Sequence, residues 1–190
     1  GCNSVAMAKP DRITEYFETL NKEIDLLLPH LRKDRRISQI HYGGGSPSSM
    51  PLPLIRGVNE HLLSAFETIE NPEIAIECHP GYLKAEDWHY LLGSGFNRFS
   101  LGIQDFNADV LHTVNRHPSL LPVAEIMDIL RKGGAKVNFH FIYVLTKQSV
   151  KEFVLTIETA ISLRPDRLVT FSYAHLPSLF KRQQILEKAG

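Results

Sequence analysis

The sequence has 190 residues, 43% of them hydrophobic, and its 21 basic and 21 acidic residues cancel to a formal net charge of zero. That length suits one well-buried domain over residues 1–190, and the balanced charge gives no reason to expect nucleic acid as a partner. No apolar run reaches the ~18 residues needed to cross a bilayer, and the N-terminus lacks signal-peptide order, so we expect a cytoplasmic protein with no membrane partner. Two cysteines, Cys2 and Cys78, are too few for a disulfide framework or a cysteine-rich metal site.

The first half of the chain alternates helical and strand patterns. Residues 11–31 carry apolar side chains at helical spacing, which predicts a long amphipathic helix. The elements expected after it are a strand over 37–42, a helix near 52–67, a strand over 73–78 and a helix over 84–92.

The second half repeats the pattern. The expected elements are a strand within 93–104, helices over 107–116 and 121–134, a strand over 136–145, a helix over 149–163 and a strand over 166–176. Ser149 and Glu152 have capping-box spacing at the start of the last helix. Strands that recur every 25 to 35 residues between helices predict an α/β fold with a parallel sheet and helical crossovers.

A run of three glycines follows the first expected strand, in "HYGGGSP" over residues 41–47. The run is either a strand-to-helix turn that needs positive φ or a place where a ligand approaches bare backbone amides. It matches neither the Walker loop nor the GxGxxG fingerprint, so it does not indicate ATP or NAD.

Polar residues gather where the expected strands end, which is where parallel βα units place their ligand sites. They are Gly43 to Ser46, Glu77, His79, Gln104, Asp105, His140 and residues 173–175. Each has an ordinary structural alternative: Glu77 could be solvated, Gln104 could be a buried amide, and Arg116 could form a surface ion pair. Three histidines, His41, His79 and His140, together with Glu77 leave open a mononuclear metal hydrolase.

Five segments carry a resemblance to a known family. They read "QIHYGGGSP", "AIECHP", "GFNRFSLGIQDFNADVLHTVNR", "FIYVLTKQSVKEF" and "RPDRLVTFSYAHLP". In this order and spacing they resemble the oxygen-independent coproporphyrinogen III oxidases, a family of radical S-adenosylmethionine (SAM) enzymes. The resemblance implies a partial (β/α) barrel of radical SAM type with parallel strands, truncated here before its first strand.

The resemblance also implies an activity in haem biosynthesis. The intact parent would use an electron donor, a [4Fe-4S] cluster and SAM to generate a 5′-deoxyadenosyl radical. That radical would abstract hydrogen from a propionate of coproporphyrinogen III, and two rounds with loss of CO₂ would yield protoporphyrinogen IX. Cofactors carry the difficult chemistry in such enzymes, and the protein positions them.

Cofactor-binding residues follow from the same resemblance, position by position. Gly44, Gly45 and Ser46 would line cofactor sites, and Glu77 would hold a ribose. A second SAM site, which this branch of the family has, would be lined by Gln104, Arg116, His140 and Ala174. The substrate has four carboxylates, so Arg116 or Arg182 could help to hold it.

The family's cluster is held by three cysteines in a CxxxCxxC motif. The opening "GCN" matches the end of that motif, so Cys2 would be a trailing cysteine and the three ligands would precede Gly1. Cys2 and Cys78 cannot hold a cluster by themselves. We therefore expect the 190-residue chain to be an excised piece that binds no metal cluster and is inactive alone.

Several positions depart from the family pattern. His140 stands in place of an acidic SAM contact, Val144 and Thr146 replace a glycine and a proline, and Cys78-His79 replaces an apolar residue and an aspartate. These changes predict a reshaped second cofactor site. They also leave open a non-catalytic haem- or porphyrin-binding protein, like the haem-chaperone relatives.

Overall fold

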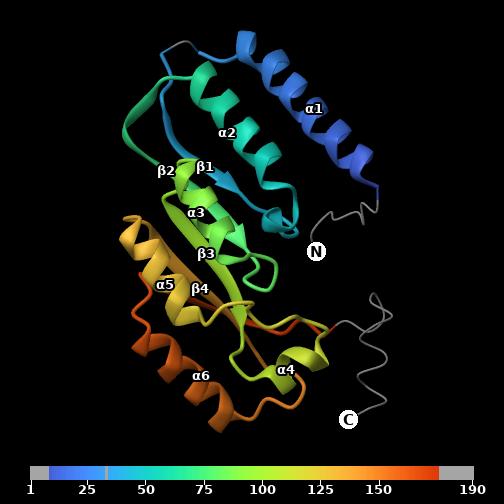
Figure 1. The fold of residues 1–190 in the computed structure, drawn as a ribbon, viewed down its shortest axis with the longest axis vertical. Coiled ribbons are helices and arrows are strands. Elements are labelled where there is room, and N and C mark those ends of the chain that lie inside the picture. Colours follow the sequence, from blue (N-terminus) through green and yellow to red (C-terminus); the bar gives the residue numbers. More distant parts are fainter. Residues whose placement is uncertain (1–8, 33, 176–190) are drawn as a thin grey trace.

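The computed structural model describes residues 9–32 and 34–175, which form a curled, five-stranded sheet with helices on its outer side (Figure 1). The strands are β1 (Ile37–Tyr42), β2 (Thr68–Cys78), β3 (Arg98–Gln104), β4 (Lys136–Tyr143) and β5 (Arg167–Ser172). The helices are α1 (Pro10–Leu27), η1 (Leu28–His30), η2 (Pro47–Ser49), α2 (Leu52–Ala65), α3 (Ala85–Gly93), α4 (Ala108–Thr113), α5 (Val123–Lys132) and α6 (Val150–Ser162).

The strand order in the sheet is the order in the sequence, β1-β2-β3-β4-β5, and every neighbouring pair is parallel. A helical crossover joins each strand to the next. The predicted α/β fold with parallel strands and a partial barrel is therefore confirmed. All five carboxyl ends lie at one edge of the sheet, so residues that are distant in sequence can share a site there.

Alternation along the strands gives the sheet an apolar outer face and a polar inner face. The outer face buries side chains against α2, α3 and α5; the fully buried ones include Ile76, Phe99, Leu101, Val137, Phe139, Phe141, Trp88, Leu91, Ile126 and Leu130. Residues between them on the strands point to the inner side of the curl. The hydrophobic core thus holds the curved sheet from outside and leaves the inner side for polar groups.

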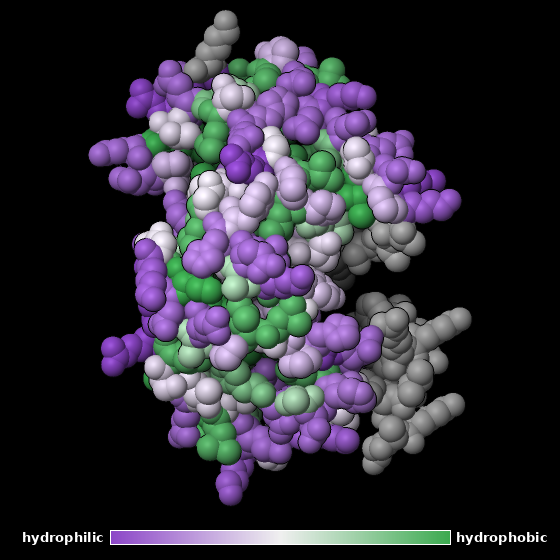
Figure 2. All heavy atoms as spheres, in the orientation of Figure 1, coloured by the Kyte–Doolittle hydropathy of each residue, from purple (hydrophilic) through white to green (hydrophobic). Residues whose placement is uncertain are grey.

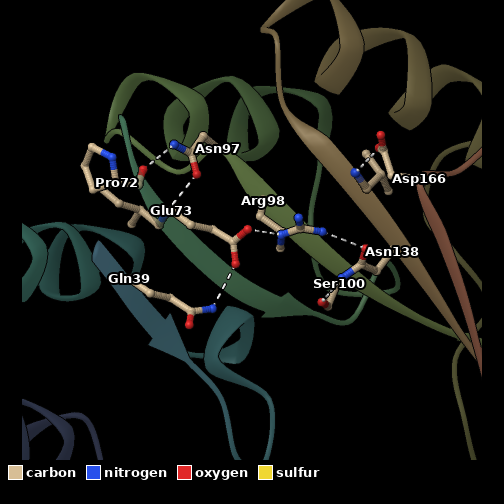
Figure 3. Close-up of polar contacts among 10 residues, drawn as sticks. Gln39, Pro72, Glu73, Asn97, Arg98, Ser100, Asn138 and Asp166 are labelled. Carbon is tan, nitrogen blue, oxygen red and sulfur yellow. Dashed lines mark hydrogen bonds and ion pairs between the residues drawn. The ribbon is translucent and has the colours of Figure 1, made fainter. Parts of the chain in front are cut away.

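The half of the inner face away from the carboxyl ends carries a ladder of polar contacts (Figure 3). Gln39 donates to Glu73 at 2.8 Å, and the Arg98 Nε donates to the other oxygen of Glu73 at 2.5 Å. Arg98 also donates to Asn138 at 3.0 Å, and Asn138 donates to Ser100 at 3.3 Å. These contacts join β1, β2, β3 and β4 and satisfy the polar groups of the inner face among themselves.

Several element boundaries differ from the prediction, and two of the differences have a physical cause in the structure. β2 begins at Thr68 instead of residue 73, because Thr68 pairs with Ile37 of β1 and the Ile37 N–H donates to the Glu67 carbonyl at 2.8 Å. α1 ends at Leu27 instead of residue 31, because Pro29 has no N–H for the next helical hydrogen bond and the chain continues as the short η1. The capping box of α6 is as predicted: Ser149 accepts from the Glu152 N–H at 3.2 Å.

A buried polar contact fixes the end of β1. Tyr42 donates to the Asn59 side chain at 3.2 Å, and Asn59, which is fully buried on α2, donates to the Ser94 carbonyl at 2.9 Å. Burial raises the pKa of the Tyr42 phenol, so this group remains a donor at neutral pH. β1 is therefore anchored to α2 and α3 one residue before the glycine run.

The surface seen in Figure 2 is mixed in character. Hydrophilic residues crowd the end of the molecule where α1 lies in Figure 1, and apolar residues form separate patches further along. No described helix is both long enough and apolar enough to pass through a bilayer.

Candidate functional site

The glycine run leaves β1 as an open loop with bare backbone. Gly44 and Gly45 have φ values of 82° and 61°, in the left-handed region that favours glycine. A Cβ on Gly44 would meet no atom within 4 Å, whereas one on Gly43 would lie 2.7 Å from His41 Nε2 and 3.2 Å from Glu77 Oε1. Gly43 thus permits close packing of two side chains, and Gly44 presents its amide beside open space.

Glu77 is the carboxyl group that faces this loop. Its Oε2 accepts from the Gly44 N–H at 3.3 Å, and its Oε1 lies 3.4 Å from His41 Nε2. Both contacts are long, and 39% of the side chain is exposed. The carboxyl group therefore has acceptor capacity left for hydroxyl or amine donors of a ligand.

A cavity of about 120 Å³ lies at the strand ends between this loop and the inner face of the sheet. Its lining residues are Gly45, Ser46, Glu77, Cys78, Ser100, Gly102, Gln104, Arg116 and His140. Six of the eight predicted site residues meet here, and Gly44 adjoins them through its hydrogen bond to Glu77. Ala174 follows β5 and does not line the cavity.

Two of the lining residues each have a buried polar atom, the Gln104 Oε1 and the Arg116 Nε, with no hydrogen-bond partner among the described residues. Buried polar groups are nearly always paired, so these two are suited to a polar ligand. Gln104 also has φ of 68° at an irregularity between β3 and β4. Strained backbone of this kind concentrates at binding sites.

Gly102 is a lining residue that the sequence prediction missed. The Arg116 Nη2 donates to the Gly102 carbonyl at 2.8 Å, and a Cβ on Gly102 would lie 2.6 Å from that same nitrogen. A glycine in the interior of an expected strand often marks a close approach, which is the signal that could have identified it.

Replacing Gly102 by alanine is expected to move the guanidinium of Arg116 without disrupting β3, because the clash is with the end of a flexible side chain. The loss of one charged hydrogen-bond donor should weaken binding of an anionic ligand group by about tenfold. Isothermal titration calorimetry measures the affinity, and a urea melt checks stability. Gly57→Ala on α2, where a Cβ meets nothing within 4 Å, is the matched control and should leave affinity unchanged.

His140 brings an imidazole into the cavity from β4. Burial lowers its pKa, the nearby charge of Glu77 opposes that shift, and His41 adds to it. His140 is therefore neutral at pH 7.

The histidines do not converge as the hydrolase alternative requires. His79 lines a separate cavity of about 210 Å³ and stacks on Tyr82 with ring centroids 4.3 Å apart. Burial, with a further effect of the Arg116 charge, lowers the pKa of His79 to about 4. Within residues 9–32 and 34–175, no group of three or more His, Cys, Asp or Glu side chains could hold a metal ion.

A larger cavity, of about 860 Å³, lies between α1, η2 and the start of α3. Its lining is mainly apolar and small, with Asp87 as its carboxyl group, and it contains none of the predicted site residues. Asp87 is already paired, since it accepts from the Lys84 N–H at 2.8 Å. We therefore place the functional site at the smaller cavity, where charged and unpartnered polar groups meet.

Comparison with known proteins identifies the family of this chain. The sequence model described as "Radical SAM superfamily" matches residues 6–160. The chain belongs to the radical SAM superfamily. Members of this superfamily use SAM and a [4Fe-4S] cluster.

Several characterised radical SAM relatives are similar over the whole chain. The oxygen-independent coproporphyrinogen III oxidase of Salmonella typhimurium is 35% identical over 190 residues, and that of Bradyrhizobium diazoefficiens is 34% identical over 191. These matches cover 100% of this chain but 41% and 42% of the relatives. The chain thus spans about two fifths of the length of the proteins it resembles.

Solved structures agree with the radical SAM assignment. Coproporphyrinogen III oxidase from Escherichia coli, described as a radical SAM enzyme, superposes with a TM-score of 0.88 at 34% identity, over 97% of this chain and 42% of that one. The archaeal Elp3 of Methanocaldococcus infernus superposes with a TM-score of 0.67 at 14% identity, over 96% of this chain and 48% of that one, and shows the fold alone.

The residues of the cavity fit SAM as a ligand. The cofactor offers ribose hydroxyls, an amine, a carboxylate and a cationic sulfonium, and the cavity offers a carboxyl group, a guanidinium and an unpartnered amide oxygen. Drug-sized ligands usually occupy ~300 Å³ or more, so a cavity of about 120 Å³ would enclose only one part of the cofactor. The remainder would lie along the open glycine loop.

The described residues do not fit an iron-sulfur cluster. Cys78 is buried in the hydrophobic core, and burial raises the pKa of its thiol, which disfavours the thiolate that a cluster needs. Cys2 and Arg182, both singled out from the sequence, lie outside the described residues.

Proposed function

We propose that this chain is the SAM-binding part of an oxygen-independent coproporphyrinogen III oxidase. The observation that carries the proposal is the cavity at the strand ends, where Glu77 borders a bare glycine loop and two lining residues have buried polar atoms with no partner in the described part of the chain. Support comes from relatives of that name that are 34–35% identical over the full 190 residues. We place the whole domain, residues 1–190, within the radical SAM partial barrel and expect it in the cytoplasm.

The side chains would divide the recognition of SAM among them, and by the family resemblance Glu77 would belong to one cofactor site and Gln104, Arg116 and His140 to a second site beside it. Glu77 would accept hydrogen bonds from the two ribose hydroxyls, as a carboxylate at a strand end does in dinucleotide-binding folds. The Arg116 guanidinium would donate to the cofactor carboxylate, because its planar donors match that group. Gln104 Oε1 would accept from an amine, and Gly44, Gly45 and Ser46 would let the cofactor approach the backbone.

When bound, SAM supplies the adenosyl carbon that takes a hydrogen atom from the substrate. The proposed substrate is coproporphyrinogen III, of which two propionates would each give a hydrogen atom to the adenosyl carbon and one electron to an external acceptor, and would lose CO₂ to leave a vinyl group. An external donor would supply the electron that SAM takes up in the parent enzyme. This chain's share of the reaction is to bind and orient the cofactor, and Arg116 supplies a cation beside the cavity. Such positioning of the reacting groups lowers the activation barrier by a large amount in cofactor enzymes.

A chimera tests the proposed activity. The chain would replace the matching segment of the Escherichia coli coproporphyrinogen III oxidase, whose remaining sequence supplies the rest of the enzyme. Because the two segments share 34% identity and a TM-score of 0.88, we expect the chimera to fold and to convert coproporphyrinogen III anaerobically. Porphyrin fluorescence after oxidation measures the product.

Two matched variants sharpen that test. Glu77→Gln in the chimera should lower turnover at subsaturating SAM at least tenfold, and Glu70→Gln, an exposed carboxylate earlier on β2, should not. A folded chimera that binds SAM but gives no product would overturn the oxidase assignment. Titration with haem then addresses the non-catalytic porphyrin binder, which a sharp Soret shift at micromolar concentration would support.

A further inference from the structure

Glu77 is flanked by two imidazoles that come from different strands. His41, on β1, lies with its Nε2 3.4 Å from Glu77 Oε1, and Gly43 permits this approach because it has no Cβ. His140, on β4, lines the same cavity as Glu77. Each imidazole therefore lies close enough to change the electrostatic potential that Glu77 creates in the cavity.

The remaining groups around His140 define its charge environment. Glu77 faces it from β2, His41 from β1 and Arg116 from the segment after α4. Cys78 also lines the cavity, and burial raises the pKa of its thiol, so it stays uncharged. Gln104 and Ser100 on β3 are uncharged, and Phe171 on β5 packs edge-on with ring centroids 6.1 Å apart. With neutral histidines, Glu77 and Arg116 balance one another, and each added proton makes the cavity positive.

We propose that His41 and His140 determine the charge specificity of this cavity, which accepts the cationic sulfonium of SAM when both imidazoles are neutral and rejects it when they are protonated. The inference rests on the proposed function and deepens it. Neutral imidazoles leave the negative charge of Glu77 available to a cation, whereas an imidazolium beside Glu77 cancels that charge. The affinity for a neutral ligand of the same shape differs much less between these two protonation states.

The sign of the pH dependence follows from His140. Burial lowers its pKa below the ordinary value of 6.5, so the cavity is competent for a cation at pH 7 and loses competence as the pH falls below that ordinary range. By linkage, bound SAM must lower the pKa of His140 further, because the cation and the proton compete. Histidine is suited to this role since small environmental changes move its titration through this range.

S-adenosylhomocysteine is the natural probe for comparison, because it has the same adenosine and amino acid groups as SAM but a neutral thioether. Calorimetry on the full 190-residue chain would give the Kd of both ligands at about pH 7.5 and about pH 5.5. We expect the ratio of Kd for SAM to Kd for the thioether to rise about tenfold at the lower pH. The comparison removes effects of partial unfolding and of the shared amino acid group, since both ligands report them equally.

Variants and a second readout complete the test. His140→Gln and His41→Gln should each flatten the change in the ratio, whereas His89→Gln, an exposed histidine on α3, should leave it unchanged. NMR titration of the His140 imidazole should show a lower pKa with SAM than with the thioether.

The outcomes separate this inference from the proposed function. Binding of both ligands with a ratio that does not depend on pH, or that depends on pH equally in His140→Gln, overturns the inference and leaves the SAM site in place. Failure of either ligand to bind at about pH 7.5 overturns the proposed function and this inference together.

Discussion

Replacing Glu77 by glutamine is expected to weaken SAM binding by about 10- to 100-fold, which corresponds to ~1.5–3 kcal/mol for hydrogen bonds to a charged group. Glutamine keeps the size of the side chain but removes its charge and one acceptor oxygen. Both oxygens of Glu77 already face the site, one toward Gly44 and the other toward His41. Calorimetry or equilibrium dialysis with the full chain measures the change.

The control for this variant is Glu70→Gln. It makes the same chemical change at an exposed position on the same strand, seven residues before Glu77. Affinity for SAM should then equal that of the unaltered chain. If the Glu77 variant also bound SAM with unchanged affinity, the carboxyl group would not be part of the binding site. The cavity would then lose its main support as a cofactor site.

Replacing Asp105 by alanine is expected to destabilise the fold by about 3 kcal/mol. Asp105 is 1% exposed at the end of β3 and accepts hydrogen bonds from the Asn107 N–H, Gln148 Nε2 and Thr156 Oγ1 at 2.8, 2.5 and 2.8 Å. Alanine would take this acceptor from the Asn107 N–H and from Thr156 Oγ1 and would leave Gln148 Nε2 with the Ile142 carbonyl alone, at 3.1 Å. Two of the three donors lie on the segment that carries α6. A urea denaturation curve gives the free energy of unfolding.

Asp128→Ala is the matched control, because Asp128 is exposed on α5. Its stability should change by less than about 0.5 kcal/mol. For a domain of this size, a loss of 3 kcal/mol also lowers Tm by roughly 6–12 °C. A midpoint for Asp105→Ala that matches that of Asp128→Ala would show that the Asp105 contacts contribute little to the free energy of unfolding.

Local patterns explain why the elements were predictable. The apolar periodicities of residues 37–42 and 136–145 identified strands, and Ser149 with Glu152 identified the start of α6, because caps depend on neighbours three residues apart. The predictions failed where a distant residue decides the boundary. Pairing of Thr68 with Ile37 of β1, which lies 31 residues earlier in the chain, extends β2 backwards.

For the candidate site too, local sequence patterns predicted some features and only contacts between distant residues decided the others. The sequence by itself determined the parallel sheet and placed Gly44, Glu77 and Gln104 at strand ends, because strands that alternate with helices along the chain run parallel in the sheet. Only the tertiary structure decided that Gly102 makes room for Arg116, that His140 shares a cavity with Glu77 and that His79 lies in another. Those facts depend on the register between strands and on the curl of the sheet, which set distances between side chains that no local spacing in the chain records.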